Sequence, residues 1–408
     1  TFFSMLAMGG FSVGWNLLKS LPLPNYWKGE DRWLPTNLVA MLGGLTSAIS
    51  LVLLGNLGTV RMIWQGMMKL AAPGGVIDGA TLTQKTAWLF NGLGLLFNGA
   101  RLPYATGEWY WIPSRAIPGD VITEFPFFTF LYADPHAHLF ALPLTTLALA
   151  WVVNLLIRRW DWRIEGINRN WIVAAITIIF GAVTIGALRP TNTWDMPTYL
   201  TLAIVVIVYT ALRYARPGQW VSWLPEKAIK VVLGVLMAGT VIVLSIWFYQ
   251  PFSNWYAQAY TSVDLWQGER SPLDSYLIHW GLFLIIIVLW LFWESVDWAA
   301  KTPLAHLRKL KPYIGILIAG AGLYLLLNVW LVIAQGVTTA LVSLTVMLWA
   351  GLLILRPGQP DEKRFVLFLV GTAMALTLAV ELIVLRGDVG RMNTVFKFYL
   401  QVWTLLAI

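Results

Sequence analysis

Long apolar runs, each about the length of a membrane-spanning helix, alternate with short polar segments along the whole chain. A helix of about 20 apolar residues crosses a bilayer, and in lipid only a helix satisfies its own backbone polar groups. The pattern predicts eleven spanning helices, two of them partial, over residues 1–18, 38–56, 136–157, 171–188, 197–215, 229–249, 276–294, 313–334, 338–355, 365–385 and 396–408. We therefore predict an all-α polytopic integral membrane protein, with one transmembrane domain over residues 1–408.

Composition supports a membrane protein and excludes several kinds of site. The chain is 58% hydrophobic and 12% charged, whereas soluble domains carry about 25% charged residues. Its 24 Trp residues are typical of aromatic belts at two lipid–water interfaces. It has no cysteine, which excludes disulfides, thiolate catalysis and cysteine-ligated metals. Both ends fall inside apolar runs, so we expect the chain to be the middle of a longer protein.

Basic residues gather on one side of the alternating spans. Most of the 28 Lys and Arg lie in or beside the segments 19–37, 158–170, 216–230, 295–312 and 356–364. The positive-inside rule makes these segments cytoplasmic, in a multi-pass protein of the plasma membrane of a bacterium or archaeon. The net charge of +8 then complements the anionic lipids of the inner leaflet. No nucleic-acid partner is predicted.

Two long segments fall on the other, non-cytoplasmic face. The outer loop 57–135 contains two amphipathic or partly apolar stretches near 58–70 and 86–98, joined by Ala72-Pro73-Gly74-Gly75. Such stretches usually lie along the membrane interface. The outer loop 250–275 is rich in Trp, Tyr, Ser and Pro.

The first polar cluster lies where the span 136–157 begins, within TEFPFFTFLYADPHAHLFALP. It contains Asp134, His136 and His138 as D-x-H-x-H, with Glu124 nearby in the sequence. Carboxylate and imidazole suit Zn or Mn, or a carboxylate acts as a general base; the structural alternative is Asp134 capping the helix. Both histidines can ligate one ion only if the helix begins after His136, because residues two apart do not share a helical face. Ionisable groups at membrane depth are costly unless used or paired, which favours function.

The second cluster is LRPTNTWDMPTY, residues 188–199. Its two prolines predict a tight, non-helical connection that carries Arg189, Asn192, Trp194 and Asp195. An arginine binds phosphate or carboxylate in bidentate fashion, and a Trp face suits a sugar or lipid headgroup. The structural alternative is a capped turn, in which Asp195 caps the next helix and Arg189 snorkels to the interface.

The third cluster is RGDVGRMNT, residues 386–394, followed by Lys397. Arg391 and Lys397 are candidate phosphate ligands, with Asn393 between them. The structural alternative here is an ion pair between Glu381, in the preceding span, and Arg386 or Arg391.

A weaker set precedes the first cluster and consists of Trp109, Trp111, Ser114 and Arg115. The usual enrichment of Trp at the membrane–water interface is enough to account for its aromatic residues. The predicted topology places this set and the three clusters on the same outer face, and this convergence is the strongest indication of function in the sequence.

Three motifs resemble the YYY membrane-protein family of Chloroflexi and archaea: EFPFFTFLYADPHAHLFALPL, RPTNTWDMPTY and GDVGRMNTVFKFYLQVW. The resemblance runs from about Phe11 to the end of the chain. The family's characteristic domain has no established function. Its members resemble, in hydropathy and outer-loop layout, polytopic GT-C glycosyltransferases, which use an acidic residue of the first outer loop and often a divalent ion. An acidic and aromatic stretch that normally precedes this region in the family is absent from this sequence.

The resemblance implies a GT-C-like glycosyltransferase that takes a sugar from a polyprenyl-phosphate carrier at the outer membrane face. The expected catalytic carboxylates are Asp134 and Glu124. The expected ligands of a divalent ion (Mg, Mn or Zn) are Asp134, His136 and His138. The expected substrate-binding residues are Arg115, Arg189, Asn192, Trp194, Asp195, Arg391, Asn393 and Lys397. Membrane lipids and the lipid-linked sugar are the expected partners, and no haem, flavin or nucleotide is implied.

Two alternatives compete with the enzyme. A transporter or flippase of a lipid-linked substrate predicts broken helices and a cavity reaching both faces. A non-catalytic subunit of a membrane assembly predicts that the clusters do not meet and that partner membrane subunits cover one side.

Overall fold

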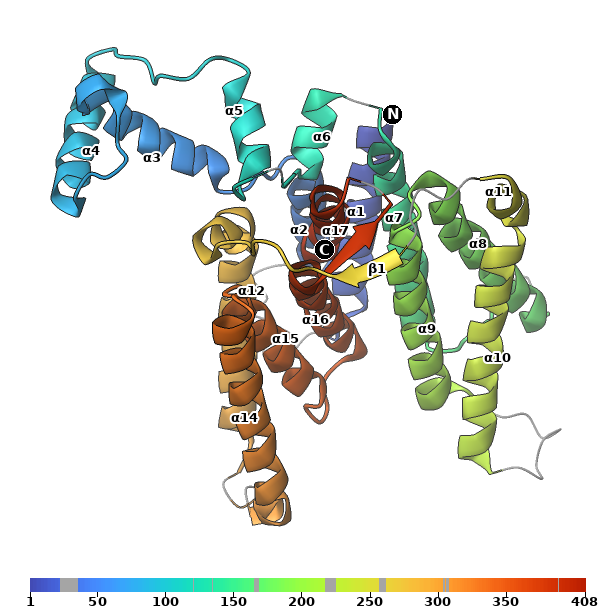
Figure 1. Ribbon diagram of the computed structural model, residues 1–408. Coiled ribbons are helices and arrows are strands. Elements are labelled where there is room, and N and C mark those ends of the chain that lie inside the picture. Colours follow the sequence, from blue (N-terminus) through green and yellow to red (C-terminus); the bar gives the residue numbers. More distant parts are fainter. Residues whose placement is uncertain are drawn as a thin grey trace.

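The computed structural model describes residues 1–22, 36–119, 121–133, 135–164, 169–216, 225–256, 262–303, 305, 308–387 and 389–408. Asp134, a predicted catalytic and metal-binding residue, lies outside the described residues. Helices account for nearly all the regular structure of the described part, together with one two-stranded sheet (Figure 1). The prediction of an all-α fold is confirmed.

Seven helical segments among the described residues are long and apolar enough to cross a membrane. They are α7 (Ala137–Arg158), α8 (Asn170–Thr191), α9 (Asp195–Tyr214), α10 (Glu226–Trp247), α12 (Leu273–Lys301), α16 (Asp361–Leu382) and the continuous segment Arg308–Ala334, made of η5 (Arg308–Tyr313), α14 (Ile314–Val329) and η6 (Trp330–Ala334). The other predicted spans are also helices: α1 (Phe2–Ser20), α2 (Thr36–Val52), α15 (Ala340–Ile354) and α17 (Arg391–Leu406). The chain is therefore a multi-pass membrane protein, with a helix in each of the predicted spans.

Close packing of small residues joins α1 to α2. A Cβ atom added at Gly44 would lie 2.9 Å from the carbonyl oxygen of Phe11, and one added at Gly14 would lie 2.9 Å from the carbonyl oxygen of Gly43. Without Cβ atoms the two backbones approach closely, which is how helices gain van der Waals contact in lipid. Next to this pair, α7 packs against α1, α8 and α9, and 67% of the residues in its most apolar stretch are buried.

The segments between α2 and α7 gather at one end of the bundle, here called the outer end after the predicted orientation (Figure 1). They form α3 (Gly58–Ala71), η2 (Pro73–Gly75), α4 (Leu82–Phe97), α5 (Glu108–Trp111), η3 (Ile112–Arg115) and α6 (Pro126–Tyr132). The two amphipathic stretches predicted here are confirmed as the helices α3 and α4, which project sideways from the bundle as a hairpin. Helix α11 (Gln250–Trp255) lies at the same end, and the end of α9 and the start of α10 lie at the opposite one.

A short antiparallel sheet, which the sequence did not predict, connects the second outer loop to the third polar cluster. Strand β1 (Ser262–Leu265) pairs with β2 (Ile383–Arg386), in the register Ser262 to Arg386 and Leu265 to Ile383. The span predicted over 365–385 therefore ends as a helix at Leu382 and continues as a strand. The sheet brings residues 266–272 beside the start of α17.

Candidate functional site

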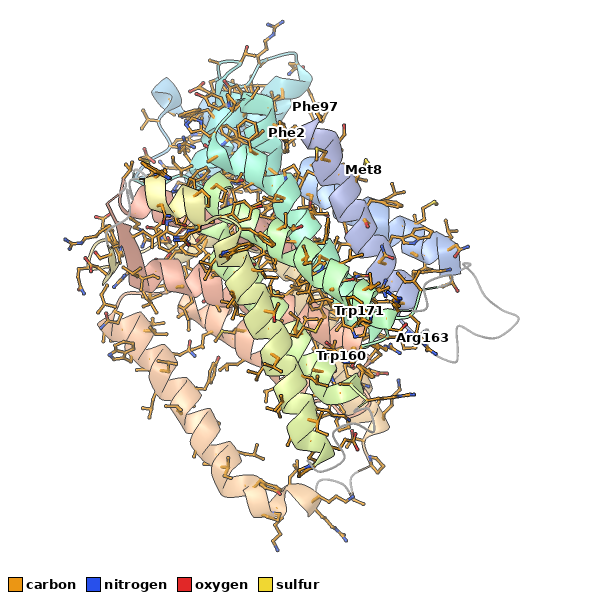
Figure 2. All side chains as sticks on the ribbon, turned by 90° about the vertical axis from the view of Figure 1, so that its right-hand side faces the viewer. Phe2, Met8, Phe97, Trp160, Arg163 and Trp171 are labelled. Carbon is orange, nitrogen blue, oxygen red and sulfur yellow. The ribbon has the colours of Figure 1, made fainter. Side chains whose placement is uncertain are left out.

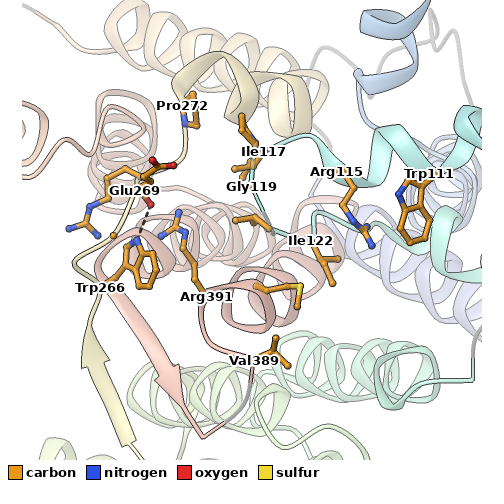
Figure 3. Close-up of a pocket in the computed structure, with 15 residues that line it drawn as sticks. Trp111, Arg115, Ile117, Gly119, Ile122, Trp266, Glu269, Pro272, Val389 and Arg391 are labelled. Atoms are coloured by element: carbon orange, nitrogen blue, oxygen red, sulfur yellow. Dashed lines mark hydrogen bonds between the residues drawn. The ribbon is translucent and has the colours of Figure 1, made fainter. Parts of the chain in front are cut away.

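A cavity of about 810 Å³ opens at the outer end and is called the outer cavity (Figure 3). Three separate segments line it: residues 111–122, residues 266–272 and the start of α17. Its polar and aromatic lining consists of Trp111, Arg115, Trp266, Glu269, Arg270 and Arg391. Three guanidinium groups around one cavity form a natural site for an anion such as phosphate.

Arg391, on one side of this cavity, is held by a buried hydrogen-bond network. Its Nη2 lies 2.8 Å from Glu381 Oε2 and donates to Ser271 Oγ at 2.9 Å, and its Nη1 donates to the Val380 carbonyl at 3.0 Å. Glu381 is fully buried and also accepts from the backbone and hydroxyl of Ser271. The ion pair predicted as the structural alternative for Arg391 is therefore present, and most of this guanidinium is already used.

Arg270 comes from the second outer loop and contributes a further charge beside Arg391. It donates from Nε to the Gln335 carbonyl at 3.2 Å and from Nη1 to the Glu381 carbonyl. Sequence reasoning missed this residue and Trp266, although both belong to a Trp-rich outer loop. Only the pairing of β1 with β2 brings them to the third cluster.

Arg115 lies across the cavity from Arg391, next to the Trp111 ring (Figure 3). Its guanidinium carbon lies 4.3 Å from the Trp111 ring centroid, and Nη1 donates to the Ser114 hydroxyl at 2.8 Å. Burial lowers the pKa of Arg115 and the Glu124 carboxylate opposes this shift, so the guanidinium stays charged at neutral pH. A quarter of the Arg115 side chain remains exposed, which leaves it accessible to a ligand.

Glu124 links the outer cavity to the first polar cluster. Its Oε1 lies 3.9 Å from Arg115 Nη1, and its Oε2 lies 3.7 Å from His138 Nε2. The side chains of Glu124 and His138 are each 12% exposed. The structure therefore places Glu124 between Arg115 of the weaker set and His138 of the first cluster.

Helix α7 begins at Ala137, with His136 at its N-cap position. The geometric condition for both histidines to reach one ion is therefore met, and their rings stack with centroids 5.8 Å apart. His136 holds the N-cap position of this helix, and Asp134, to which the capping alternative applies, lies outside the described residues. Within the described ranges no group of three His, Asp or Glu side chains could hold a metal ion, and the predicted site stays a prediction because it includes Asp134.

The second cluster packs directly against the first. Asn192 Nδ2 donates to Asp195 Oδ2 at 3.1 Å, and both side chains are buried. They share a small cavity of about 10 Å³ with His138 and Gln401. This space is too small for a substrate, so Asn192 and Asp195 support the site from behind.

Residues of α17 and α9 complete this contact. Gln401 donates to the Trp194 carbonyl at 2.9 Å and accepts from Thr198 Oγ1 at 2.5 Å. Lys397 interacts electrostatically with Asp195. The third cluster therefore meets the second through Lys397, and the outer cavity through Arg391.

Other predicted residues lie apart from the cavity. Arg189 and Pro190 belong to α8, which continues to Thr191, so the predicted non-helical connection is restricted to residues 192–194. A proline near the end of a membrane helix costs little, because neighbouring groups satisfy the backbone. Arg189 and Asn393 are partly buried and do not line the outer cavity. Trp109 lies in a separate, mostly apolar groove of about 570 Å³.

Comparison with known protein families gives a match that spans nearly the whole chain. The model of the uncharacterized membrane protein family DUF2298 matches residues 1–406. This chain is a DUF2298 protein. No curated protein and no solved structure matches the DUF2298 chain. Membership of DUF2298 agrees with a multi-pass membrane protein and assigns no activity to the cavity.

Proposed function

We propose that this protein is a GT-C-like glycosyltransferase. It takes a sugar linked to a polyprenyl phosphate at the non-cytoplasmic membrane face and transfers it to a glycan, lipid or protein. One observation carries the proposal: Glu124 lies between Arg115 and His138, and Arg115 also faces a cavity with two further arginines. A carboxylate beside a cationic cavity has the parts that glycosyl transfer from a phosphate requires.

The reaction divides between these groups. Glu124 accepts the proton of the acceptor hydroxyl while the oxygen of that hydroxyl forms a bond to the anomeric carbon of the sugar. The bond from that carbon to the phosphate oxygen breaks, and the electron pair leaves with the lipid phosphate. Arg115 stabilises the departing phosphate, and Arg270 adds positive charge across the cavity. Asp134 remains a second candidate base, and Mg, Mn or Zn remains a candidate cofactor; no step here depends on the ion.

The apolar groove supports a lipid-linked donor. Residues from α3, α5 and α6 line it, including Trp109, Tyr110, Phe127 and Leu131. The turn formed by α5 and η3 contributes Tyr110 to the groove and Arg115 to the outer cavity. An isoprenoid chain in the groove would therefore reach the cavity with its phosphate.

The test is sugar transfer by the purified full chain in proteoliposomes supplied with a panel of polyprenyl-phosphate hexoses. Glu124→Gln should lower turnover by a factor of about 10²–10⁴, as expected on loss of a general base. Glu108→Gln is the matched control, because Glu108 is an exposed carboxylate of the same outer loop. Equal turnover of the two variants, or no transfer from any donor, would overturn the proposal.

A transporter is the second candidate, favoured by the presence of cavities at both ends of the bundle. Between them α7 and α9 are tightly packed, with Leu149, Leu202 and Ala203 fully buried. A flippase predicts that the donor changes leaflet in these proteoliposomes without loss of its sugar. That result would replace the enzyme with the transporter.

A further inference from the structure

A second polar cavity, of about 980 Å³, lies at the end opposite the outer cavity and is called the cytoplasmic cavity. The last turns of α7 and α9 and the first turns of α8 and α10 surround it. Its basic lining consists of Arg158, Arg159, Arg163, Arg213, Arg216 and Lys230. The carboxylates in the lining are Asp161 and Glu226. Basic side chains thus outnumber acidic ones in the described lining, which favours an anionic ligand.

Buried carboxylates of α16 fix two of these arginines from behind. Arg159 Nη2 lies 3.1 Å from Glu362 Oε1, and Arg213 Nε lies 3.2 Å from Asp361 Oδ1. Both carboxylates are almost fully buried, whereas the two arginine side chains are 45% and 43% exposed. Each guanidinium is therefore anchored at one edge and presents its other edge to the cavity.

Both carboxylates in the lining are already paired within it. Asp161 binds Arg163 at 2.6 Å, and Glu226 binds Lys230 at 2.6 Å, one helical turn apart. The hydrogen bonds from Arg163 hold the pKa of Asp161 well below its usual range. Because Glu362 and Asp361 compensate Arg159 and Arg213 from behind, Arg158 and Arg216 remain as the positive excess around the described lining.

The backbone at the end of α7 takes an unusual course beside the cavity. Arg159 and Trp160 are consecutive non-glycine residues with φ of +50° and +65°, in the left-handed region. This conformation is costly for residues with a Cβ atom and is found at binding sites more often than elsewhere. It turns the chain so that Trp160 packs edge to face on Trp162, at 5.7 Å between ring centroids.

The cavity lies at the level where spanning helices end, which is the level of lipid headgroups. Figure 2 shows Trp160, Arg163 and Trp171 gathered at this end of the bundle. Trp171 is 67% exposed, and tryptophan is enriched at the membrane interface. The N-termini of α8 and α10 add partial positive charge at the same place.

We propose that the cytoplasmic cavity binds the phosphate headgroup of an anionic lipid from the cytoplasmic leaflet. Arginines favour phosphate because their planar donor edge matches its oxygens. A soluble phosphate ester shares this chemistry, but the tryptophans and the position at the ends of the spans favour a lipid. The proposal is independent of sugar transfer at the outer end.

The experiment measures binding of dioctanoyl phosphatidic acid to the purified full chain in detergent, with glycerol phosphate as the soluble competitor. The test variant is Arg158→Gln with Arg216→Gln, which removes the two arginines that form the positive excess of the described lining. The matched control is Arg308→Gln with Lys309→Gln, exposed basic residues predicted on the same face but outside the cavity.

We expect the dissociation constant to rise about tenfold or more in the test variant, because charge-assisted hydrogen bonds are lost. The matched control should bind as the unaltered chain does, and glycerol phosphate should compete poorly. An equal loss in the matched control would show general surface attraction and overturn the site. Equal binding of glycerol phosphate would overturn the lipid in favour of a soluble anion.

Discussion

The outer and cytoplasmic cavities both gather arginines, and the same helix, α16, anchors arginines at each. At the outer end Glu381 is fully buried and its partner Arg391 is only 7% exposed. At the cytoplasmic end Asp361 and Glu362 are equally hidden, but their arginines are nearly half exposed. A fully buried pair chiefly fixes the fold, whereas a half-exposed arginine still has donors for a ligand. The comparison favours Arg115 over Arg391 as the residue that would bind the proposed ligand at the outer end.

The largest expected effect is an all-or-none difference in labelling between the two ends. Because the chain has no cysteine, single replacements report accessibility directly. Val389→Cys, at the outer cavity, should react with a membrane-impermeant maleimide in intact cells. Ile164→Cys, next to the cytoplasmic cavity, should react only after the membrane is opened; both positions are exposed. Labelling of both positions from the same side would show that the two cavities do not lie on opposite sides of the membrane.

The next effect concerns stability. Glu381→Gln should lower the free energy of unfolding by about 3–5 kcal/mol, because it leaves Arg391 buried without its counter-charge. Asp264→Asn, which breaks the more exposed ion pair between Asp264 and Arg386, should cost about 0–1 kcal/mol. Thermal unfolding of the two purified variants in one detergent provides the comparison. Similar losses would mean that burial does not distinguish these pairs.

The smallest effect concerns the chemistry of Arg115. Arg115→Lys keeps the charge but loses the planar contact with Trp111 and the fork of donors. The apparent affinity for the polyprenyl-phosphate donor should fall roughly 10–100-fold, as expected when hydrogen bonds to a charged group are lost. Steady-state transfer against donor concentration measures it, with Arg163→Gln as the control at the other cavity. An unchanged affinity would return the phosphate-binding role to Arg270 and Arg391.

Much of the candidate site follows from local sequence. The start of α7 after His136 follows from Pro135, which is incompatible with an ongoing helix, and charge placement identified Arg115 and Glu124 as outer-face groups. Arg270 and Trp266 could not be predicted in the same way, because their position depends on pairing between segments more than 100 residues apart. The sequence also did not predict that α8 continues through Pro190. A local rule for proline does not take into account that neighbouring groups in a membrane protein can bond to the backbone groups that proline leaves free.

The sequence by itself determined that this is an all-α multi-pass membrane protein and which segments are helical, because lipid imposes the length, apolarity and helical conformation of every span. The distribution of lysine and arginine along the sequence also predicts which loops are cytoplasmic. Only the tertiary structure decided which polar groups meet. Ion pairs such as Glu381 with Arg391, and cavities lined by three or four separate segments, depend on how the helices pack. That packing depends on side-chain fit across the whole bundle, which hydropathy along the chain does not encode.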